Sequence, residues 1–262
     1  MQKEKRKFPW KKILLIAAGV LLAALLLAEP AYYLYKDVTF YWSDRTETEK
    51  QVKAYAEKMG ISYGRYPQSL IDLLERNPET EAFVLDYPFH EAQSYDLTAV
   101  SRAEVPLFLQ WDSRWGYGKY GSDCMGITGC GPTCLAMAGY YLTGSDTFDP
   151  AAVAAFAQQR GYYAPGYGSS WTLISEGGVT LGLQVTEIPL VKKKIMDNLE
   201  AGNPIICAMG KGDFSSSGHY IVLVGTENGL IRVNDPNSYA NSEKLWSYEE
   251  MESQFRNLWV IQ

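Results

Sequence analysis

An uncharged apolar run near the N-terminus limits most strongly what this chain can fold into. Residues 13–28 contain no charged side chain, and six basic side chains precede them within residues 1–12. A helix of this length spans roughly 24 Å, slightly less than the roughly 30 Å of a hydrocarbon core. Trp10 and the tyrosines of 32–35 flank the run, where aromatic side chains anchor helices at membrane interfaces. We therefore expect a transmembrane anchor over residues 13–35.

The basic tail over residues 1–12 indicates the orientation of this anchor. Positively charged flanks stay in the cytoplasm, so the N-terminus is expected inside and the bulk of the chain outside the cell. A cleaved signal peptide is the alternative, and it would yield a secreted protein. Cleavage after Ala28 or Ala31 would leave Leu26 or Glu29 at the −3 position. Neither is a small residue, so the sequence favours a single-pass protein of the cell membrane.

The rest of the chain divides by composition. Residues 36–104 are polar and read as a helical membrane-proximal segment with a linker, whereas residues 105–262 mix helical and strand patterns. We expect the main domain in this second region. The net charge of −6 gives no reason to expect a nucleic-acid partner.

Four elements of the main domain bear on function. An apolar stretch rich in small residues predicts a buried helix from Cys130 to Leu142, and residues 105–111 read as a short strand. Strand-like segments at 219–225 and 230–235 flank "TENG", in which an Asn-Gly pair is a strong hairpin signal.

The stretch "TGCGPTC" holds two of the four cysteines, Cys130 and Cys134. A structural zinc site needs four ligands, usually in two pairs, and the other cysteines stand singly, so neither a metal nor another cofactor is expected. Disulfides between Cys134 and either Cys124 or Cys207 stay open from sequence alone. Cys134 and Cys207 lie among apolar residues, where a free buried cysteine acts as a small hydrophobe.

Cys130 is the candidate for a reactive thiol. It stands where the helix is expected to begin, with Pro132 close to the first helical position. Amide groups at a helix N-terminus stabilise negative charge and therefore favour a thiolate. Gly129 and Gly131 on either side lack side chains, so a substrate backbone is expected to approach closely there.

A thiolate nucleophile needs a base, and the base needs an orienting group. The chain has two histidines, and His90 has no accompanying catalytic pattern, whereas His219 opens a strand of the expected hairpin. The loop length places the residues opposite His219 near 235–238. Asp235 ends the second strand and is the candidate orienting group. A solvated turn aspartate and a satisfied strand-end histidine are the alternatives.

An oxyanion donor would complete such a site. Gln110 lies upstream of Cys130 at the end of the expected strand, and its side-chain amide can donate to a developing oxyanion. Backbone amides at the beginning of the Cys130 helix would share this task. An ordinary strand-end glutamine is the alternative.

The order of these motifs resembles the papain-like cysteine peptidases related to bacteriocin-processing (double-glycine leader) peptidases. The resemblance rests on Gln110 and on "GCGPT", "GHYIVLVG" and "VNDPN". It is similar to the free-standing, membrane-anchored branch of Gram-positive bacteria rather than to the domain fused to an export transporter. "NPETEAFVLDYP" also resembles the membrane-proximal portion of that branch, so the resemblance covers roughly residues 60–262.

The resemblance implies a papain-like α+β fold, in which a central helix carrying the cysteine packs on an antiparallel sheet carrying the histidine and the aspartate. It implies Cys130 as nucleophile, His219 as general base and acid, Asp235 as orienting group and Gln110 in the oxyanion hole. In transporter-fused and papain-type members the glutamine lies only a few residues before the cysteine. Here a long glycine-rich insertion separates the two.

The expected activity is hydrolysis of peptide bonds through a thioester acyl-enzyme. The expected partners are a peptide or protein substrate, cell-wall peptide included, and the membrane around the N-terminal helix. Two alternatives keep the same fold. One is an amidase or endopeptidase of cell-wall peptides, and the other is a tethered binding module whose papain-like cleft has lost catalysis.

Overall fold

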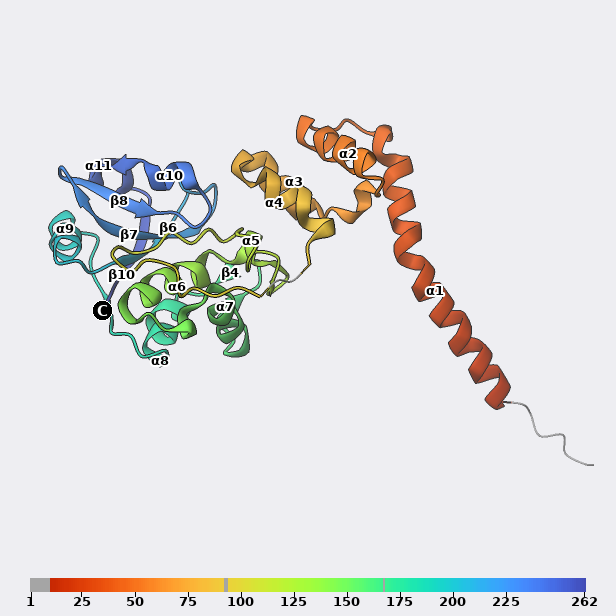
Figure 1. The fold of residues 1–262 in the computed structure, drawn as a ribbon, viewed down its shortest axis with the longest axis horizontal. Coiled ribbons are helices and arrows are strands. Elements are labelled where there is room, and N and C mark those ends of the chain that lie inside the picture. The colour runs from red at the N-terminus through yellow and green to blue at the C-terminus, as the bar shows by residue number, and fades with distance from the viewer. Residues whose placement is uncertain (1–9, 92–93, 167) are drawn as a thin grey trace, which may run out of the picture. The chain divides into compact units, whose positions relative to one another are not determined.

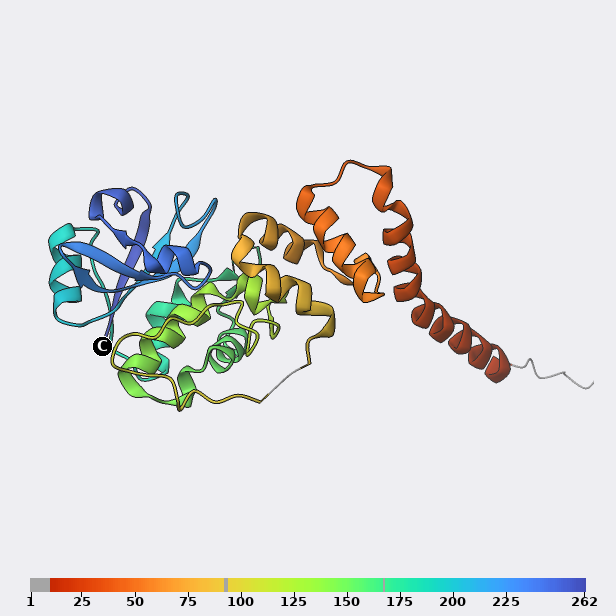
Figure 2. The ribbon, with the colours of Figure 1, turned by 45° about the horizontal axis from the view of Figure 1, so that its top comes forward.

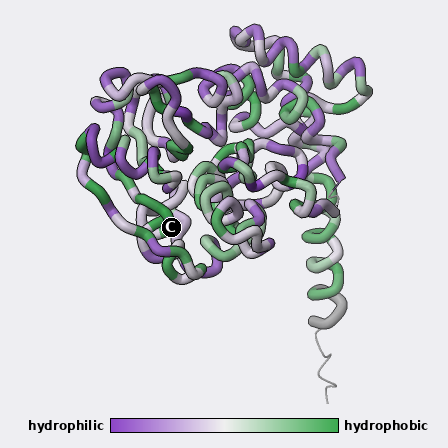
Figure 3. The backbone as a smooth tube through the Cα atoms, turned by 60° about the vertical axis from the view of Figure 1, so that its left-hand side comes forward, coloured by the Kyte–Doolittle hydropathy of each residue, from purple (hydrophilic) through white to green (hydrophobic). Residues whose placement is uncertain are grey.

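A long apolar helix begins the part of the chain that the structure describes. The computed structural model describes residues 10–91, 94–166 and 168–262, and helix α1 runs over Trp10–Thr39 (Figure 1). Within these residues, one stretch, Leu14–Trp42, is long and apolar enough to cross a membrane. The helix is largely green in the hydropathy colouring of Figure 3, and none of its apolar window is buried. By length and composition it suits a membrane anchor or a signal sequence.

The chain divides into two compact units after Glu75. In the first unit, the last turns of α1 pack against short helices, where Asp37 accepts hydrogen bonds from the Lys53 ammonium at 2.9 Å and the Tyr63 N–H at 3.0 Å. Thr46 forms a capping box at the start of α2, and Gly60 ends that helix with a positive φ of 70°. The other elements of this unit are η1 (Phe40–Trp42), α2 (Glu47–Met59), η2 (Tyr63–Arg65) and α3 (Gln68–Arg76).

The second unit contains a six-stranded antiparallel sheet in the order β5-β10-β6-β7-β8-β9. Its strands are β5 (Val185–Glu187), β6 (Ile205–Met209), β7 (His219–Glu227), β8 (Leu230–Asn234), β9 (Leu245–Trp246) and β10 (Phe255–Ile261). Two small hairpins pair β1 (Lys119–Tyr120) with β2 (Asp123–Cys124) and β3 (Tyr163–Ala164) with β4 (Gly168–Ser169).

Helices make up much of the rest of the second unit. The α-helices are α4 (Glu81–Asp86), α5 (Met125–Thr128), α6 (Cys130–Thr143), α7 (Pro150–Gln159), α8 (Gly178–Thr180), α9 (Lys192–Glu200), α10 (Tyr239–Glu243) and α11 (Tyr248–Met251). Shorter turns are η3 (Pro78–Thr80), η4 (Tyr87–Phe89), η5 (Asp146–Phe148) and the π-helical η6 (Leu173–Gly177).

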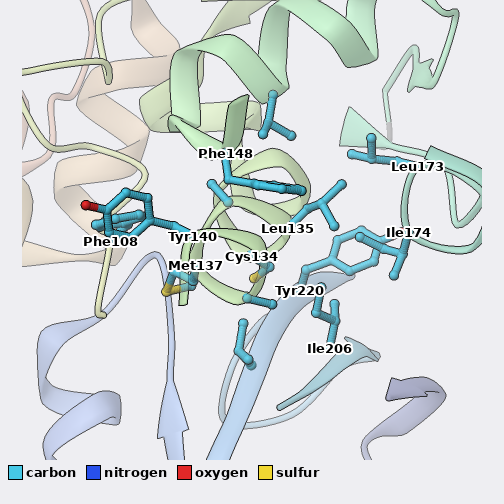
Figure 4. Close-up of a cluster of buried hydrophobic side chains, with 14 of the residues drawn as sticks. Phe108, Cys134, Leu135, Met137, Tyr140, Phe148, Leu173, Ile174, Ile206 and Tyr220 are labelled. Atoms are coloured by element: carbon cyan, nitrogen blue, oxygen red, sulfur yellow. The ribbon is translucent and has the colours of Figure 1, made fainter. Parts of the chain in front are cut away.

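The two faces of the sheet bury separate apolar clusters because side chains alternate along each strand. On one face, Ile206 and Tyr220 pack with Leu135 and Met137 of α6, as the close-up in Figure 4 shows. On the other face, strand residues such as Ile221 pack with residues of α9. Helix α6 lies along the sheet in the views of Figures 1 and 2. The fold is therefore a mixture of helices and an antiparallel sheet around a central buried helix, as the sequence predicts.

The hairpin expected around "TENG" is confirmed. Strands β7 and β8 pair antiparallel on either side of Asn228 and Gly229, whose φ values are 52° and 79°. Positive φ at both central turn residues is the requirement that Asn-Gly satisfies. Val222 pairs with Asn234, so Asp235 follows the hairpin near the beginning of β7.

The strand expected over residues 105–111 is wrong. That segment has no strand pairing, and the Gln110 N–H donates instead to the carbonyl of Pro236 at 2.7 Å. Its apolar side chains Val105 and Phe108 are buried in the cluster beside α6. Burial of an irregular segment therefore produced the strand-like pattern. The glycine-rich insertion between Gln110 and Cys130 carries β1, β2 and α5.

Close packing around α6 predicts a stability effect at Gly139. A Cβ atom there would lie 2.0 Å from the Phe148 ring, so a Gly139→Ala substitution forces the ring or the helix to move. We expect the free energy of unfolding to fall by about 1–3 kcal/mol. Chemical denaturation of the full-length protein in detergent measures this change.

The matched control is Gly225→Ala, because a Cβ atom at that position meets nothing within 4 Å. We expect this control to unfold at the same denaturant concentration as the wild type. Equal stability of the Gly139→Ala and Gly225→Ala proteins would contradict the packing described here.

Candidate active site

Cys130 is the first residue of α6, and it is the most accessible of the four cysteines. The short helix α5 ends just before it, and the Thr133 N–H and Oγ1 both donate to the carbonyl of Gly129, at 3.0 and 2.8 Å. The first amides of a helix have no intrahelical acceptor, and the helix dipole concentrates positive charge there. The Cys130 thiol therefore lies at the electropositive end of a 14-residue helix.

The two glycines beside Cys130 lie where a side chain would collide with neighbouring protein atoms. A Cβ atom at Gly129 would lie 2.5 Å from the Met125 carbonyl oxygen, and one at Gly131 would lie 2.6 Å from Ser169 Oγ. The absence of side chains at these two positions lets α5 and β4 pack tightly against the start of α6.

His219 and Asp235 form a buried polar pair near Cys130. The His219 Nε2 atom lies 2.7 Å from Asp235 Oδ1, and the two side chains are 8% and 1% exposed. The hairpin brings the histidine at the start of β7 next to the aspartate that follows β8. Since Nε2 contacts the aspartate, Nδ1 is the ring nitrogen left for the thiol of Cys130.

A set of polar residues that the sequence did not single out holds the Asp235 carboxylate. Its Oδ1 also accepts from the Asn237 N–H and its Oδ2 from the Asn241 amide, both at 2.8 Å. The Asp235 N–H donates to Ser242 Oγ at 2.9 Å. The asparagines and serines after "VNDP" were the available signal, because such residues bond to nearby backbone in turns.

The surroundings of His219 favour its charged form. Burial lowers the pKa of His219, but the charge and hydrogen bond of Asp235 raise it more, and the Cys130 side chain adds to this rise, so that the pKa is raised to about 10. His219 is therefore an imidazolium at neutral pH. A cation beside the sulfur of Cys130 stabilises a thiolate.

Gln110 is buried between the Asp235 loop and the turn that precedes Cys130. Its backbone N–H donates to Pro236, and its side-chain Nε2 donates to the Gly126 carbonyl at 2.8 Å. The Gly126 acceptor fixes the amide orientation, because the reversed amide would set two oxygens against each other. One Nε2 hydrogen occupies this bond and the second stays available as a donor.

The other three cysteines are buried, and the second histidine, His90, packs against an aromatic ring. Burial raises the pKa of Cys124 to about 12 and those of Cys134 and Cys207 well above their ordinary value. All four cysteines are free, so neither possible disulfide forms. His90 packs against the Tyr117 ring, with a centroid distance of 3.8 Å. Within residues 10–91, 94–166 and 168–262, no group of three His, Cys, Asp or Glu side chains could hold a metal ion.

The raised pKa of His219 can be tested by NMR titration of the full-length protein with isotope-labelled histidine. The chain has only two histidines, so a His90→Phe variant assigns the signals. We expect His219 to stay protonated through pH 8 and to lose its proton near pH 10. Asp235→Asn should lower that midpoint, because it removes the neighbouring negative charge. A wild-type midpoint near 6.5, the ordinary pKa of histidine, would contradict the close contact between His219 and Asp235.

The raised pKa of His219 also predicts how the stability of the fold depends on pH. Because the folded pKa of His219 exceeds the ordinary 6.5, its pairing stabilises the fold fully below pH 6.5. This contribution declines as the pH rises from 6.5 through 10. We expect the stability difference between the wild type and Asp235→Asn to narrow over that interval.

Comparisons with known proteins identify the family. The model of the Peptidase_C39 like family matches residues 102–262. The peptidase domain of Streptococcus ComA, a bi-functional ABC transporter involved in a quorum sensing pathway, is 22% identical, with 51% of this chain and 89% of that chain covered and a TM-score of 0.39. A C39-like peptidase from Bacillus anthracis is 15% identical, with 60% and 94% covered and a TM-score of 0.36.

No curated protein matches the chain. The family model covers the whole region from the segment before Gln110 to the C-terminus, which contains all four candidate site residues. The resemblance read from the sequence motifs is thereby confirmed at the level of the family. The chain belongs to the Peptidase_C39 like family.

Proposed function

We propose that this protein is a membrane-anchored cysteine peptidase that hydrolyses peptide bonds outside the cell through Cys130, His219 and Asp235. The family membership supports a peptidase of the cysteine type. The observation that carries the residue assignment is the 2.7 Å contact between buried His219 and Asp235 next to a cysteine at a helix N-terminus. A nucleophile, a base and an orienting carboxylate in this order are what thiol-dependent acyl transfer requires.

The first half of the proposed reaction forms a thioester. The proton of Cys130 rests on His219, and the sulfur attacks the carbonyl carbon of the substrate peptide bond. The carbonyl oxygen gains negative charge in the tetrahedral intermediate. As the C–N bond breaks, His219 gives its proton to the departing amine, and the acyl group remains on sulfur.

The second half releases the acyl group. A water molecule gives a proton to the now neutral His219 and attacks the thioester carbonyl. The C–S bond then breaks, the product carboxylic acid leaves, and the thiolate and imidazolium are restored. Asp235 takes no proton in either half: it keeps Nε2 bound, so that Nδ1 faces the sulfur, and it stabilises the imidazolium.

Gln110 is the proposed oxyanion donor. The hydrogen bond to the Gly126 carbonyl fixes the orientation of its side-chain amide and leaves one N–H as a donor. Gly126 lies four residues before Cys130. The backbone amides of Cys130 and Gly131 at the beginning of α6 are the second proposed source of donors. A preorganised donor of this type stabilises the charge that develops on the substrate oxygen.

The proposed location rests on the N-terminal helix. α1 is uninterrupted from Trp10 to Thr39, and its apolar window is exposed. We propose that residues 1–12 stay in the cytoplasm, that 13–35 cross the membrane, and that 36–104 connect this anchor to a peptidase domain over 105–262. The excess of basic side chains before the helix supports this orientation.

Cys130→Ala tests the nucleophile. We expect it to reduce hydrolysis of a peptide library by at least about 1000-fold, because the variant cannot form the thioester. We also expect iodoacetamide at pH 7 to label the wild type at Cys130 and to leave this variant unlabelled. Mass spectrometry of the labelled protein checks the position.

Cys124→Ala is the control for this experiment, because it removes a buried thiol instead. It should retain wild-type hydrolysis and labelling. Full activity of Cys130→Ala, or labelling at Cys134 in the wild type, would refute the assignment.

Gln110→Ala tests the oxyanion donor. We expect kcat to fall about 100- to 1000-fold with little change in KM, because the lost hydrogen bond forms only in the transition state. Steady-state kinetics on the fastest library peptide measure both constants, and thermal unfolding checks that the variant is folded. The control Gln184→Ala removes an exposed glutamine. A Gln110→Ala enzyme with unchanged kcat would remove Gln110 from the mechanism.

A further inference from the structure

The segment over residues 77–86 lies upstream of the part of the chain that the family model matches, which begins at residue 102. It contains η3 and α4 and belongs to the same compact unit as the candidate site. Its side chains contact both the loop that carries Asp235 and the turn that leads to Cys130. These contacts suggest a role in the reaction.

Two side chains of the segment bind the loop after Asp235. The buried Asn77 donates from Nδ2 to the Asn237 carbonyl. The Glu79 carboxylate accepts from Ser238 Oγ at 2.9 Å and from the backbone N–H groups of Tyr239 and Ala240, at 2.6 and 3.1 Å. These four bonds cross about 160 residues of sequence.

Two of these anchor points, Asn237 and Ser238, connect to the Asp235 carboxylate through one and two hydrogen bonds, respectively. The residue whose carbonyl Asn77 binds, Asn237, donates its own N–H to Asp235 Oδ1. Ser238, which donates to Glu79, accepts from the N–H of Asn241, and the Asn241 amide donates to Asp235 Oδ2. The position of the carboxylate therefore depends on the loop that Asn77 and Glu79 hold.

The other end of the segment packs against the turn before Cys130. The Phe83 ring stacks on Tyr117, with centroids 4.3 Å apart and planes within 13°, and the Tyr117 hydroxyl donates to the Phe83 carbonyl at 2.9 Å. A Cβ atom at Gly126 would lie 2.6 Å from the same ring. Gly126 belongs to α5 and accepts the hydrogen bond of Gln110.

The segment therefore contacts both the loop that carries Asp235 and the turn that precedes Cys130. These two parts of the site must keep a fixed position relative to each other. Residues 110–111 also hold the loop, since Trp111 Nε1 donates to the Asn237 carbonyl at 2.9 Å. The Asn237 carbonyl thus accepts from Asn77 and Trp111 together, and both donors contribute to its placement.

We propose that residues 77–86 are a positioning element of the peptidase, and that Asn77 and Glu79 act through the 235–241 loop to hold Asp235 against His219. This inference rests on the proposed function. It places the start of the catalytic unit before residue 77 instead of at residue 105. Neither Asn77 nor Glu79 touches the reacting atoms, so both are positioning residues.

Asn77→Ser in the full-length protein is the direct test. Serine keeps an acceptor for the Glu79 N–H, which Asn77 Oδ1 accepts at 3.1 Å, but it lacks the amide that reaches Asn237. The variant adds no charge near His219. We expect kcat to fall about tenfold, because a small misplacement of a catalytic group is costly, and we expect the NMR titration midpoint of His219 to move down.

Asn198→Ser is the matched control, because Asn198 also donates from Nδ2 to a backbone carbonyl, that of Lys194 on α9, at 2.8 Å. It should leave kcat and the His219 midpoint unchanged. Glu79→Asp is a second variant that keeps the charge and shortens the reach, and it should shift both readouts in the same direction as Asn77→Ser.

Unchanged kcat and an unchanged His219 midpoint in both segment variants would overturn the positioning role. A lower kcat together with an unchanged midpoint would also overturn it, because general destabilisation would explain that result. The midpoint does not depend on hydrolysis. If Cys130→Ala hydrolysed peptides as fast as the wild type, the proposed function would fail while the midpoint still tested the contact between the segment and Asp235.

Discussion

The hydrogen bond between His219 and Asp235 is the interaction on which the rest of this site depends. A buried imidazolium is unfavourable by itself, because burial favours the neutral ring. The buried carboxylate at 2.7 Å reverses that preference. The carboxylate in turn would be costly to bury without its own donors, and the loop after β8 supplies them. The hairpin turn at Asn228-Gly229 sets the register that brings the two residues together.

Tight packing around α6 fixes the position of Cys130, the third residue of the site. The helix is buried along most of its length, and glycines at its start let α5 and β4 approach to contact distance. Such a site tolerates little movement, since protein interiors are close-packed. The position of the Cys130 sulfur is therefore set by the fold as a whole rather than by a local loop.

Local patterns predicted much of this architecture. The helix from Cys130, the Asn-Gly hairpin and the aspartate after it follow from rules that act over a few residues, and the structure contains all three. The strand prediction over residues 105–111 was wrong, because an irregular segment that buries apolar side chains has the same composition as a short strand. The contacts of Asn77 with Asn237 left no signal in the sequence, since they join residues 160 positions apart.

In the proposed site, Asp235 affects Cys130 only through His219. The alkylation rate of Cys130 by iodoacetamide at pH 7, compared among the wild type, His219→Ala, Asp235→Ala and the double variant, tests this directly. We expect each single substitution to slow alkylation, and we expect the double variant to react at the rate of His219→Ala alone. A double variant slowed by the product of the two single effects would contradict it, because Asp235 would then act on the thiol independently of the histidine.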